Sequence, residues 1–481
     1  MKWLSVLTGL FALPYLLLAQ AQDKPFLEIR PYQAPAYEQY AVHAQMDHYY
    51  PTQTSNHLYI RFDGDSSQSA DPPAATCIDG QNCYDGHSGS DYWMPEGIPL
   101  LAAAPGKIVW AQFEAGLDSC PNGLPPNGDL GVVIIDHQNG YYSVYLHLQP
   151  PMVVAVGQSV QTGDTIGYNG KSGCAGVAHL HFEIRQGAYY FDQQNSWAID
   201  PYGWWGKGHD PVKAMRGHSS VWLWKSSLLV DDGDNGFERF YGPQWNRLNY
   251  GYNGDAWEVP AVTSYADSRH YAVWVPEIPA KGTYDIQAFL PSTAQAVNKA
   301  VYEIYVKRPG DINEQNKVIV NQSAAADSFV TIARKELMAG ANCAVILRDV
   351  VKPDASGSHV LFDAVRFVPV ATGLQSPGRH EHLPQTIKIM AAYPNPFNTR
   401  QARAASILKF ELRQTAQVRI SVQNILGQTV DTILSRTFAQ GLHRIHWDGR
   451  DSLNRRLPGG VYFYKIISGN TVKFRKIILI Q

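Results

Sequence analysis

Polar and apolar residues alternate one by one through most of this chain. That alternation is typical of β-strands, in which successive side chains point to opposite faces of a sheet. Stretches with the longer period of an amphipathic helix are nearly absent, and the best short helix candidate is ARKELMAG at residues 333–340. We therefore predict an all-β, multidomain protein.

Turn-rich stretches divide the chain into blocks. The 481 residues are enough for several domains, because a domain typically has about 150 residues. A first block spans residues 22–215, a second spans 219–370, a polar linker spans 371–390, and a third block spans 391–481. Strand-like runs alternate with Gly, Pro and Asn turns in the last two blocks, so we predict that each is a β-sandwich.

The first 21 residues have the layout of a secretory signal peptide. Lys2 precedes an apolar run from Trp3 to Leu18, and Ala19-Gln20-Ala21 matches the A-x-A cleavage pattern. The alternative, a membrane anchor, is disfavoured because the run is short and is interrupted by Pro14. We expect cleavage after Ala21 and an exported mature protein without a membrane span.

Charged residues nearly cancel, with 40 basic and 42 acidic side chains. A nucleic acid or an anionic membrane surface would favour a strongly basic chain. We therefore expect neither as a partner.

Export makes the five cysteines informative, because disulfides persist outside the cytosol. Proximity and shared block favour the pairs Cys77–Cys83 and Cys120–Cys174, although four cysteines allow three connectivities. Cys343 stands alone. Metal binding by these thiols is the weaker interpretation, because no C-x-x-C spacing is present.

The stretch YDGHSGSDYW, residues 84–93, places His87 and Asp91 four positions apart. Such a pair is either a polar turn or part of a metal site. A catalytic zinc ion typically takes three protein ligands and leaves a further position to water. A third ligand elsewhere in the chain would therefore favour the metal site.

Two strand-like runs supply further histidines. In AHLHFEIR, residues 178–185, alternation places His179, His181 and Glu183 on one face and the apolar residues in the core. In YYSVYLHL, residues 141–148, it groups His147 with Ser143 and Tyr145. The intervening run GVVIID is apolar on both faces, as expected of a central strand. An H-x-H pair by itself is more often a structural pair, but its combination with HSGSD favours a metal site.

At these residues the sequence resembles the lysostaphin-type, or LytM-like, zinc endopeptidases over residues 47–205. The resemblance implies an antiparallel β-sheet core and one Zn²⁺ ion bound by His87, Asp91 and His181. It also implies that His147 and His179 act on the water and the tetrahedral intermediate. The departures are an insertion at residues 113–129 and Cys174 in the loop before HLH, and these put the fine specificity in question.

Elementary chemistry agrees with that implication. Zinc lowers the pKa of a bound water toward about 7 and so supplies hydroxide, which would attack a peptide carbonyl. The family cuts peptide cross-links of peptidoglycan, often next to glycine, so the resemblance implies a peptidoglycan substrate. Two alternatives stay open: an extracellular protease on glycine-rich proteins, and a non-catalytic wall-binding or activator protein. The presence of all five site residues favours activity.

Other polar clusters have simpler interpretations. The rival zinc motif H-E-x-x-H is absent, and HEH at residues 380–382 is a polar turn in the linker. His137 belongs to a strand-end turn. His48 is ambiguous between a structural role and a place in the groove. We expect the aromatic cluster DPYGWW, residues 200–205, to pack beneath the site.

The last two blocks have resemblances of their own. LLVDDGDNGF, WVPEIPAKGTYDIQAFLP and HVLFDAVRFVPV resemble the golvesin-type β-sandwich, which implies a binding or spacer role. YPNPFN and the runs after it resemble the C-terminal sorting domain of type IX secretion, against the alternative of an ordinary immunoglobulin-like adhesion domain. The sorting resemblance implies the type IX machinery as a partner and a secreted or surface-attached protein that passes through the periplasm. We expect the protein to be a monomer.

Overall fold

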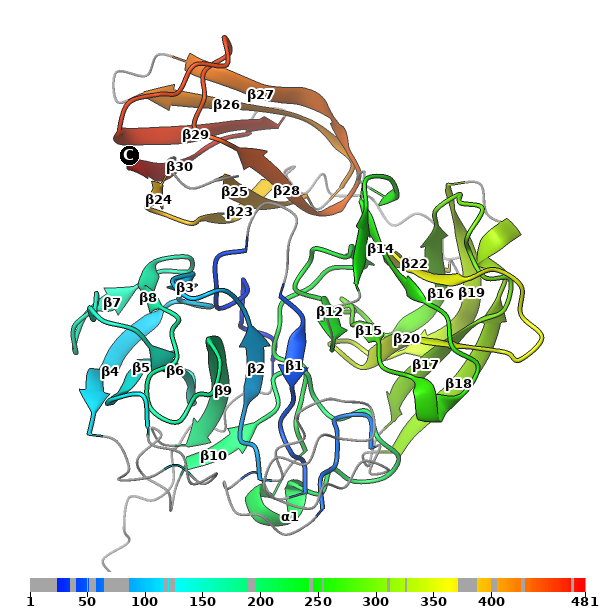
Figure 1. Cartoon of the computed structure of the whole chain (residues 1–481). Helices are drawn as coiled ribbons and strands as arrows, with labels where there is room; N and C mark the ends of the chain where they lie inside the picture. The colour runs from blue at the N-terminus through cyan, green and yellow to red at the C-terminus, as the bar shows by residue number, and fades with distance from the viewer. Residues whose placement is uncertain are drawn as a thin grey trace, which may run out of the picture.

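The protein is described by a computed structural model, shown in Figure 1. The described residues are 24–34, 40–49, 51, 58–64, 86–115, 120, 126–187, 196–217, 219–241, 245–252, 255–308, 312–324, 327–370, 387–398, 405–412, 414–424, 429–468 and 471–480. The predicted signal peptide, the predicted Cys77–Cys83 pair and residues 371–386 of the linker lie outside them, whereas residues 387–390 of the linker belong to a strand. The described chain is nearly all β, as predicted.

One 13-stranded sheet runs through the first two blocks. Strand β1 (Val42–Ala44) lies in its middle, antiparallel to β2 (Ser90–Trp93) and parallel to β12 (Phe237–Phe240). Figure 1 shows β1 and β2 between the two groups of strands that they join. Strand β1 belongs to residues 22–83, the part of the first block before the metal-binding motifs, which we call the lead-in. The lead-in thus contributes a strand to the sheet that both blocks share.

Antiparallel strands build the first block beyond β2. They are β9 (His179–Gly187), β6 (Tyr141–Leu148), β5 (Leu130–Asp136), β4 (Gly106–Glu114) and β7 (Ser159–Val160), with β10 (Ser196–Ile199) beside β9 and a separate pair of β3 (Pro99–Leu101) and β8 (Thr165–Tyr168). The run GVVIID lies in β5 between β4 and β6, so the prediction of a central strand is confirmed. Leu180, Phe182 and Ile184 of β9 lie in the core, also as predicted.

The aromatic cluster packs into the same core. Tyr202, Trp204 and Trp205 are buried, which confirms the packing interpretation. A disulfide joins Cys120 in the insertion to Cys174, as expected, and Cys343 is free and buried. His137 follows the end of β5, and its ring contacts the carbonyl of Pro105 and the hydroxyl of Ser143.

The second block is a β-sandwich around one core. Its share of the large sheet consists of β12, β15 (Tyr271–Trp274), β20 (Cys343–Val351), β17 (Ala300–Arg308) and β18 (Ile312–Val320). The facing sheet is β11 (Leu229–Val230), β22 (Val365–Pro369), β16 (Gly282–Leu290) and β19 (Ser328–Leu337), and a third sheet is β13 (Asn246–Leu248), β14 (Ala256–Pro260) and β21 (His359–Phe362).

The helix predicted at residues 333–340 is wrong, because Ser328–Leu337 is strand β19. The segment pairs along its length with β16, and Arg334 forms an ion pair with Asp285 of that strand at 2.6 Å. Helix-favouring residues such as Ala, Lys and Glu exert only a weak preference, which this tertiary pairing overrides.

Helices contribute little to the described chain. They are α1 (Lys213–Arg216), η2 (Tyr265–Asp267) and η3 (Gln322–Ala324). Among the described residues, none of the helices combines the length and the apolar character needed to cross a membrane.

The third block is also a two-sheet sandwich. One sheet is β23 (Ile387–Tyr393), β25 (Ser406–Leu412) and β28 (Gly441–Trp447); the other is β24 (Phe397–Asn398), β30 (Thr471–Ile480), β29 (Gly460–Ser468), β26 (Ala416–Asn424) and β27 (Thr429–Phe438). It touches the second block where Lys409 donates to the Asn235 side chain at 2.9 Å.

Buried ion pairs fix the lead-in to the rest of the molecule. Arg30 lies 2.7 Å from Glu238 of the second block, and Asp63 contacts Arg348 of the same block. His48 lies between Asp210 at 2.9 Å and Asp200 at 3.0 Å and is fully buried. Burial alone would lower the pKa of His48, but these two carboxylates outweigh it and raise the pKa to about 10. His48 therefore has the structural role.

Candidate metal centre

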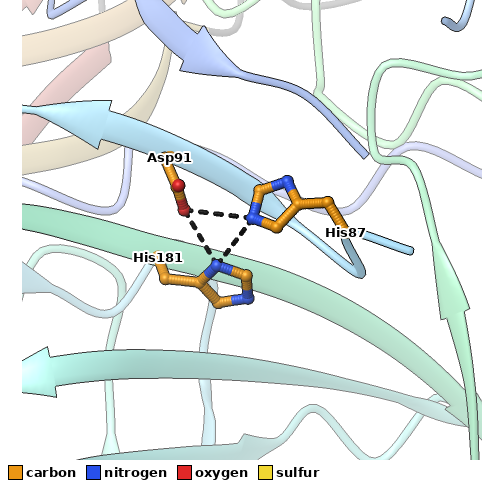
Figure 2. A group of neighbouring side chains, drawn as sticks. All are labelled: His87, Asp91 and His181. Carbon is orange, nitrogen blue, oxygen red and sulfur yellow. Dashed lines mark hydrogen bonds and ion pairs between the residues drawn. The ribbon is translucent and has the colours of Figure 1, made fainter. Parts of the chain in front are cut away.

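The pairing of β2 with β9 creates the candidate metal centre. Asp91 on β2 lies directly opposite His181 on β9, and cross-strand partners share a face of the sheet. His87 lies just before β2. The His181 Nδ1 atom is 2.8 Å from Asp91 Oδ1 and 3.0 Å from His87 Nε2. Figure 2 marks these contacts between the three side chains with dashed lines. Among the described residues this is the one His, Cys, Asp and Glu group whose ligand atoms all lie within 4.8 Å of one another.

The donor atoms suit zinc. Two imidazole nitrogens and one carboxylate oxygen are the protein ligands of many catalytic zinc sites, which keep a further position open. Burial alone would lower the pKa of His181, but hydrogen bonds to Asp91 and Glu183 outweigh it and raise the pKa to about 10 in the metal-free chain. A metal ion would therefore have to displace a proton from His181.

Hydrogen bonds orient the two imidazoles. The Nδ1–H of His87 donates to the carbonyl of Gln45 at 2.8 Å, which leaves its Nε2 lone pair for a metal. The Nε2–H of His181 donates to Glu183 at 2.9 Å, which leaves Nδ1. The Asp47 carboxylate accepts from the backbone N–H of Gly86 at 2.9 Å and so braces the turn that carries His87.

Glu183 is a fully buried carboxylate behind His181. Its oxygens also accept from Ser88 Oγ at 2.5 Å and Arg185 at 2.6 Å. Burial alone would raise the pKa of Glu183, but Arg185, His181 and Ser88 outweigh it and lower the pKa to about 2. Glu183 therefore stays ionised and sets the orientation of the His181 ring.

Replacing Glu183 by glutamine should weaken zinc binding by about 10- to 100-fold, as is usual when the hydrogen-bond partner of a metal-bound histidine is removed. The amide keeps the shape of the side chain but removes the charge that makes His181 a stronger donor. Competition with a chromophoric chelator would measure the change, with circular dichroism as the check on folding. Unchanged affinity would mean that the sheet alone orients His181.

His147 and His179 lie beside the triad. The ring centroids of these two residues are 4.5 Å apart, and His179 Nε2 is 3.7 Å from Asp91 Oδ1. The Nδ1–H of His147 donates to the carbonyl of Ser172 at 2.8 Å, and that of His179 donates to the carbonyl of Val177 at 2.9 Å. Each ring is thereby fixed through its Nδ1 atom, and its Nε2 atom takes no part in that bond.

The face predicted for His147 is wrong. Tyr145 lies opposite Phe182 in the core, so strict alternation would place His147 on the core face too. His147 instead has φ of +66°, and the register between β5 and β6 shifts at this point. This β-bulge turns the imidazole toward His179 and lets Leu148 enter the core.

The environment of His147 keeps it neutral. Burial, together with the neighbouring His179 and His181, lowers its pKa to about 3. His147 is therefore neutral at neutral pH, and its Nε2 atom can accept a hydrogen bond.

Sequence reasoning missed one wall of the site. Trp93 lies opposite His179 on the paired strands, and its side chain is 40% exposed. His43 of β1 stacks on it, with ring centroids 3.3 Å apart, and Tyr241 of the second block follows at 5.7 Å from His43. Trp93 is the last residue of the stretch 84–93 that carries His87 and Asp91. The sequence gives no sign of its contact with His43, because that contact depends on the pairing of β1 with β2.

Comparison with known proteins agrees with this geometry. The profile of Peptidase family M23 matches residues 85–201, that of the Golvesin C-terminal domain matches 229–369, and that of the FlgD Ig-like domain matches 398–471. Two similar curated proteins are the peptidoglycan DD-endopeptidases ShyA and ShyC of Vibrio cholerae serotype O1, at 34% and 36% identity over 98 residues. Those 98 residues are 20% of this chain and 20% of each relative, so the chain spans about a fifth of their length.

Among solved structures, the catalytic domain of lysostaphin from Staphylococcus simulans is 28% identical, with 25% of this chain and 77% of that chain covered and a TM-score of 0.19. The matched M23 segment contains all five predicted site residues and the β2–β9 pairing that gathers the His–Asp–His group. The chain therefore carries a peptidase family M23 domain, followed by a Golvesin C-terminal domain.

Proposed function

We propose that this protein is a secreted zinc endopeptidase that hydrolyses peptide cross-links of peptidoglycan. The observation that carries the proposal is the triad His87, Asp91 and His181 with two further imidazoles beside it, each fixed through its Nδ1 atom. Zinc in the triad would supply a Lewis acid and a water of lowered pKa. The similar ShyA and ShyC are peptidoglycan DD-endopeptidases, which supports the substrate class.

The two imidazoles divide the proton transfers. His147 is neutral and fixed through Nδ1, so its Nε2 accepts the proton of the attacking water and later returns it to the leaving amine. His179 lies nearer to Asp91 and hydrogen-bonds the reacting centre. Their orientation is held by the backbone carbonyls of Ser172 and Val177.

The full mature chain, loaded with zinc, should be incubated with purified peptidoglycan and separately with a glycine-rich protein, each with a chelator control. New termini would be identified by mass spectrometry. Chelator-sensitive cuts in stem or bridge peptides support the proposal, and cuts in protein alone point to an extracellular protease. Zinc binding without any new termini would favour a wall-binding or activator protein.

Trp93 should contribute to substrate binding beside His179. Replacing it by alanine should raise KM about tenfold with little change in kcat, because one aromatic stacking contact contributes about 1–1.5 kcal/mol. The phenylalanine variant, which keeps an aromatic face, should recover most of the affinity. Steady-state kinetics on a soluble cross-link peptide, with the zinc content measured in parallel, tests this. A fall in kcat at constant KM would contradict it.

The export route is part of the proposal. The signal sequence and the resemblance of the third block to type IX sorting domains support passage through the periplasm to the medium or the cell surface. The FlgD Ig-like profile matches residues 398–471 of the same block, which keeps an immunoglobulin-like domain without a sorting role as the second candidate. Deleting residues 391–481 in a producing cell and following the protein by fractionation distinguishes the two, because retention in the periplasm is expected only for a sorting signal.

A further inference from the structure

Three rings form a row that leads away from the metal centre and crosses into the second block. Trp93 of β2 lies opposite His179, and His43 of β1 stacks on Trp93 with ring centroids 3.3 Å apart. Tyr241, just after β12, follows with its ring centroid 5.7 Å from that of His43. We call Trp93, His43 and Tyr241 the aromatic row. Its members come from three separate parts of the chain, which meet because β1 lies between β2 and β12 (Figure 1).

The aromatic row lies on the metal-binding face of the sheet. Asp91 and Trp93 are two positions apart on β2, so their side chains share one face, whereas Tyr92 between them is in the core. On β1, Val42 pairs with Tyr92 and also enters the core, so the next residue, His43, points to the metal-binding face. The register between β1 and β2 shifts around His43, and a bulge of this kind commonly re-aims a side chain beside an active site.

His43 brings a neutral polar ring into the aromatic row. Burial lowers its pKa to about 4, although the nearby Asp91 carboxylate acts in the opposite direction. A neutral imidazole offers one N–H donor and one acceptor nitrogen. Among the described residues neither nitrogen of His43 has a hydrogen-bond partner, so both are available to a ligand. A peptide amide presents the matching acceptor and donor.

Backbone hydrogen bonds hold Tyr241 on both sides. Its N–H donates to the carbonyl of Val42 at 2.8 Å, and its carbonyl accepts from the indole N–H of Trp245 at 2.5 Å. Tyr241 has φ of +63°, a conformation that is unfavourable for a bulky side chain. Strain of this kind is typical of positions where a side chain must be held ready for a ligand.

We propose that the aromatic row binds the stem peptide of the substrate and that Tyr241 of the second block is a specificity-determining residue. The inference rests on the proposed function, because the row begins beside the metal centre. An extended peptide advances about 3.3 Å per residue, so the row spans about two or three residues next to the scissile bond. Trp93 and Tyr241 would pack on their side chains, and His43 would hydrogen-bond the amide between them.

A peptide suits this position better than a glycan strand. The row starts opposite His179, so its occupant must be joined directly to the bond that is cut. In a peptide cross-link that neighbour is another amino acid, and the sugars lie beyond the stem peptide. The second block would therefore read the peptide part of the substrate.

The test compares a short and a long cross-link peptide on the full mature, zinc-loaded chain. The long peptide carries about three residues on each side of the scissile bond, enough to reach Tyr241, and the short one ends before it. We expect kcat/KM to be about tenfold higher for the long peptide, the size of one aromatic contact. Tyr241→Ala should lose that advantage. Tyr241→Phe, which keeps the ring, should retain it, as should Tyr250→Ala, which changes an exposed tyrosine of the same block.

His43 is tested separately with His43→Phe. This variant keeps a ring to stack on Trp93 and removes both polar nitrogens, so KM should rise about three- to tenfold with little change in kcat. A variant with unchanged KM would remove His43 from peptide binding.

The peptide comparison separates this inference from the proposed hydrolysis. A wild-type chain that cuts both peptides equally well overturns the inference alone, as does an equal loss on both for Tyr241→Ala, which would show a structural role. An advantage that requires an attached disaccharide would assign the row to the glycan instead. If neither peptide is cut, the hydrolysis fails, and binding followed by tryptophan fluorescence decides the inference. Tighter binding of the long peptide that depends on Tyr241 then supports it, and equal or absent binding overturns it.

Discussion

Replacing His181 by alanine should abolish both zinc binding and peptide hydrolysis. His181 is the central member of the triad, because its Nδ1 atom lies 2.8 Å from Asp91 and 3.0 Å from His87. Removing it leaves two ligands, and a catalytic zinc site normally requires three. Hydrolysis should fall to the uncatalysed background, since the remaining imidazoles would have no activated water to act on.

Equilibrium dialysis followed by elemental analysis would measure the zinc content, and release of soluble peptides would measure the activity. His137→Ala is the matched control, because this imidazole also belongs to the first block but contacts Pro105 and Ser143 instead of the triad. It should keep both properties. Full zinc occupancy in a folded His181→Ala chain would show that the metal centre is assigned to the wrong residues.

Replacing His147 by alanine should leave zinc bound and reduce kcat by about 10²- to 10⁴-fold, the usual contribution of one general acid–base group. The ring centroids of His147 and His181 are 6.1 Å apart, and His147 is not a member of the His–Asp–His group. Its loss therefore removes a proton acceptor and no ligand. The substitution should leave the backbone strain at this position nearly unchanged, because alanine is no better suited than histidine to a positive φ.

Steady-state kinetics with zinc analysis on the same preparation tests this prediction. A loss confined to kcat with unchanged zinc supports a role in proton transfer, because a transition-state interaction is what has been removed. A His147→Ala chain with full activity would remove His147 from the mechanism, and one that has lost zinc would make it a fourth ligand or a support of the fold.

The local sequence pattern was enough to predict strands such as β9 and β5. In β9 polar and apolar residues alternate because one face meets the core, and in β5 the run GVVIID is apolar because both faces are covered. It failed at β19, where composition favoured a helix and pairing with β16 decided for a strand. The three residues of the His–Asp–His group, and the two histidines beside it, could also be selected from the sequence, because their motifs are short and contiguous. Their roles and the domain boundaries stay predictions.

Features that depend on contacts across the chain could not be read from the sequence. The bulge at His147 arises from the register between two strands, so alternation assigned that imidazole to the wrong face. The stacking of His43 on Trp93 and the contact of Gln45 with His87 both require β1 to pair with β2. No local property of residues 42–45 indicates that pairing.

The place of β1 in the shared sheet has a consequence for anyone who wishes to excise or transplant the enzyme. A fragment cut after residue 217 would lose β12 and leave β1 as an exposed edge strand, which invites aggregation through its unpaired backbone groups. A fragment that begins at the M23 segment would lose the carbonyl of Gln45 that orients His87. The orientation of His87 in the M23 segment thus depends on β1, and β1 in turn is covered by a strand of the neighbouring sandwich.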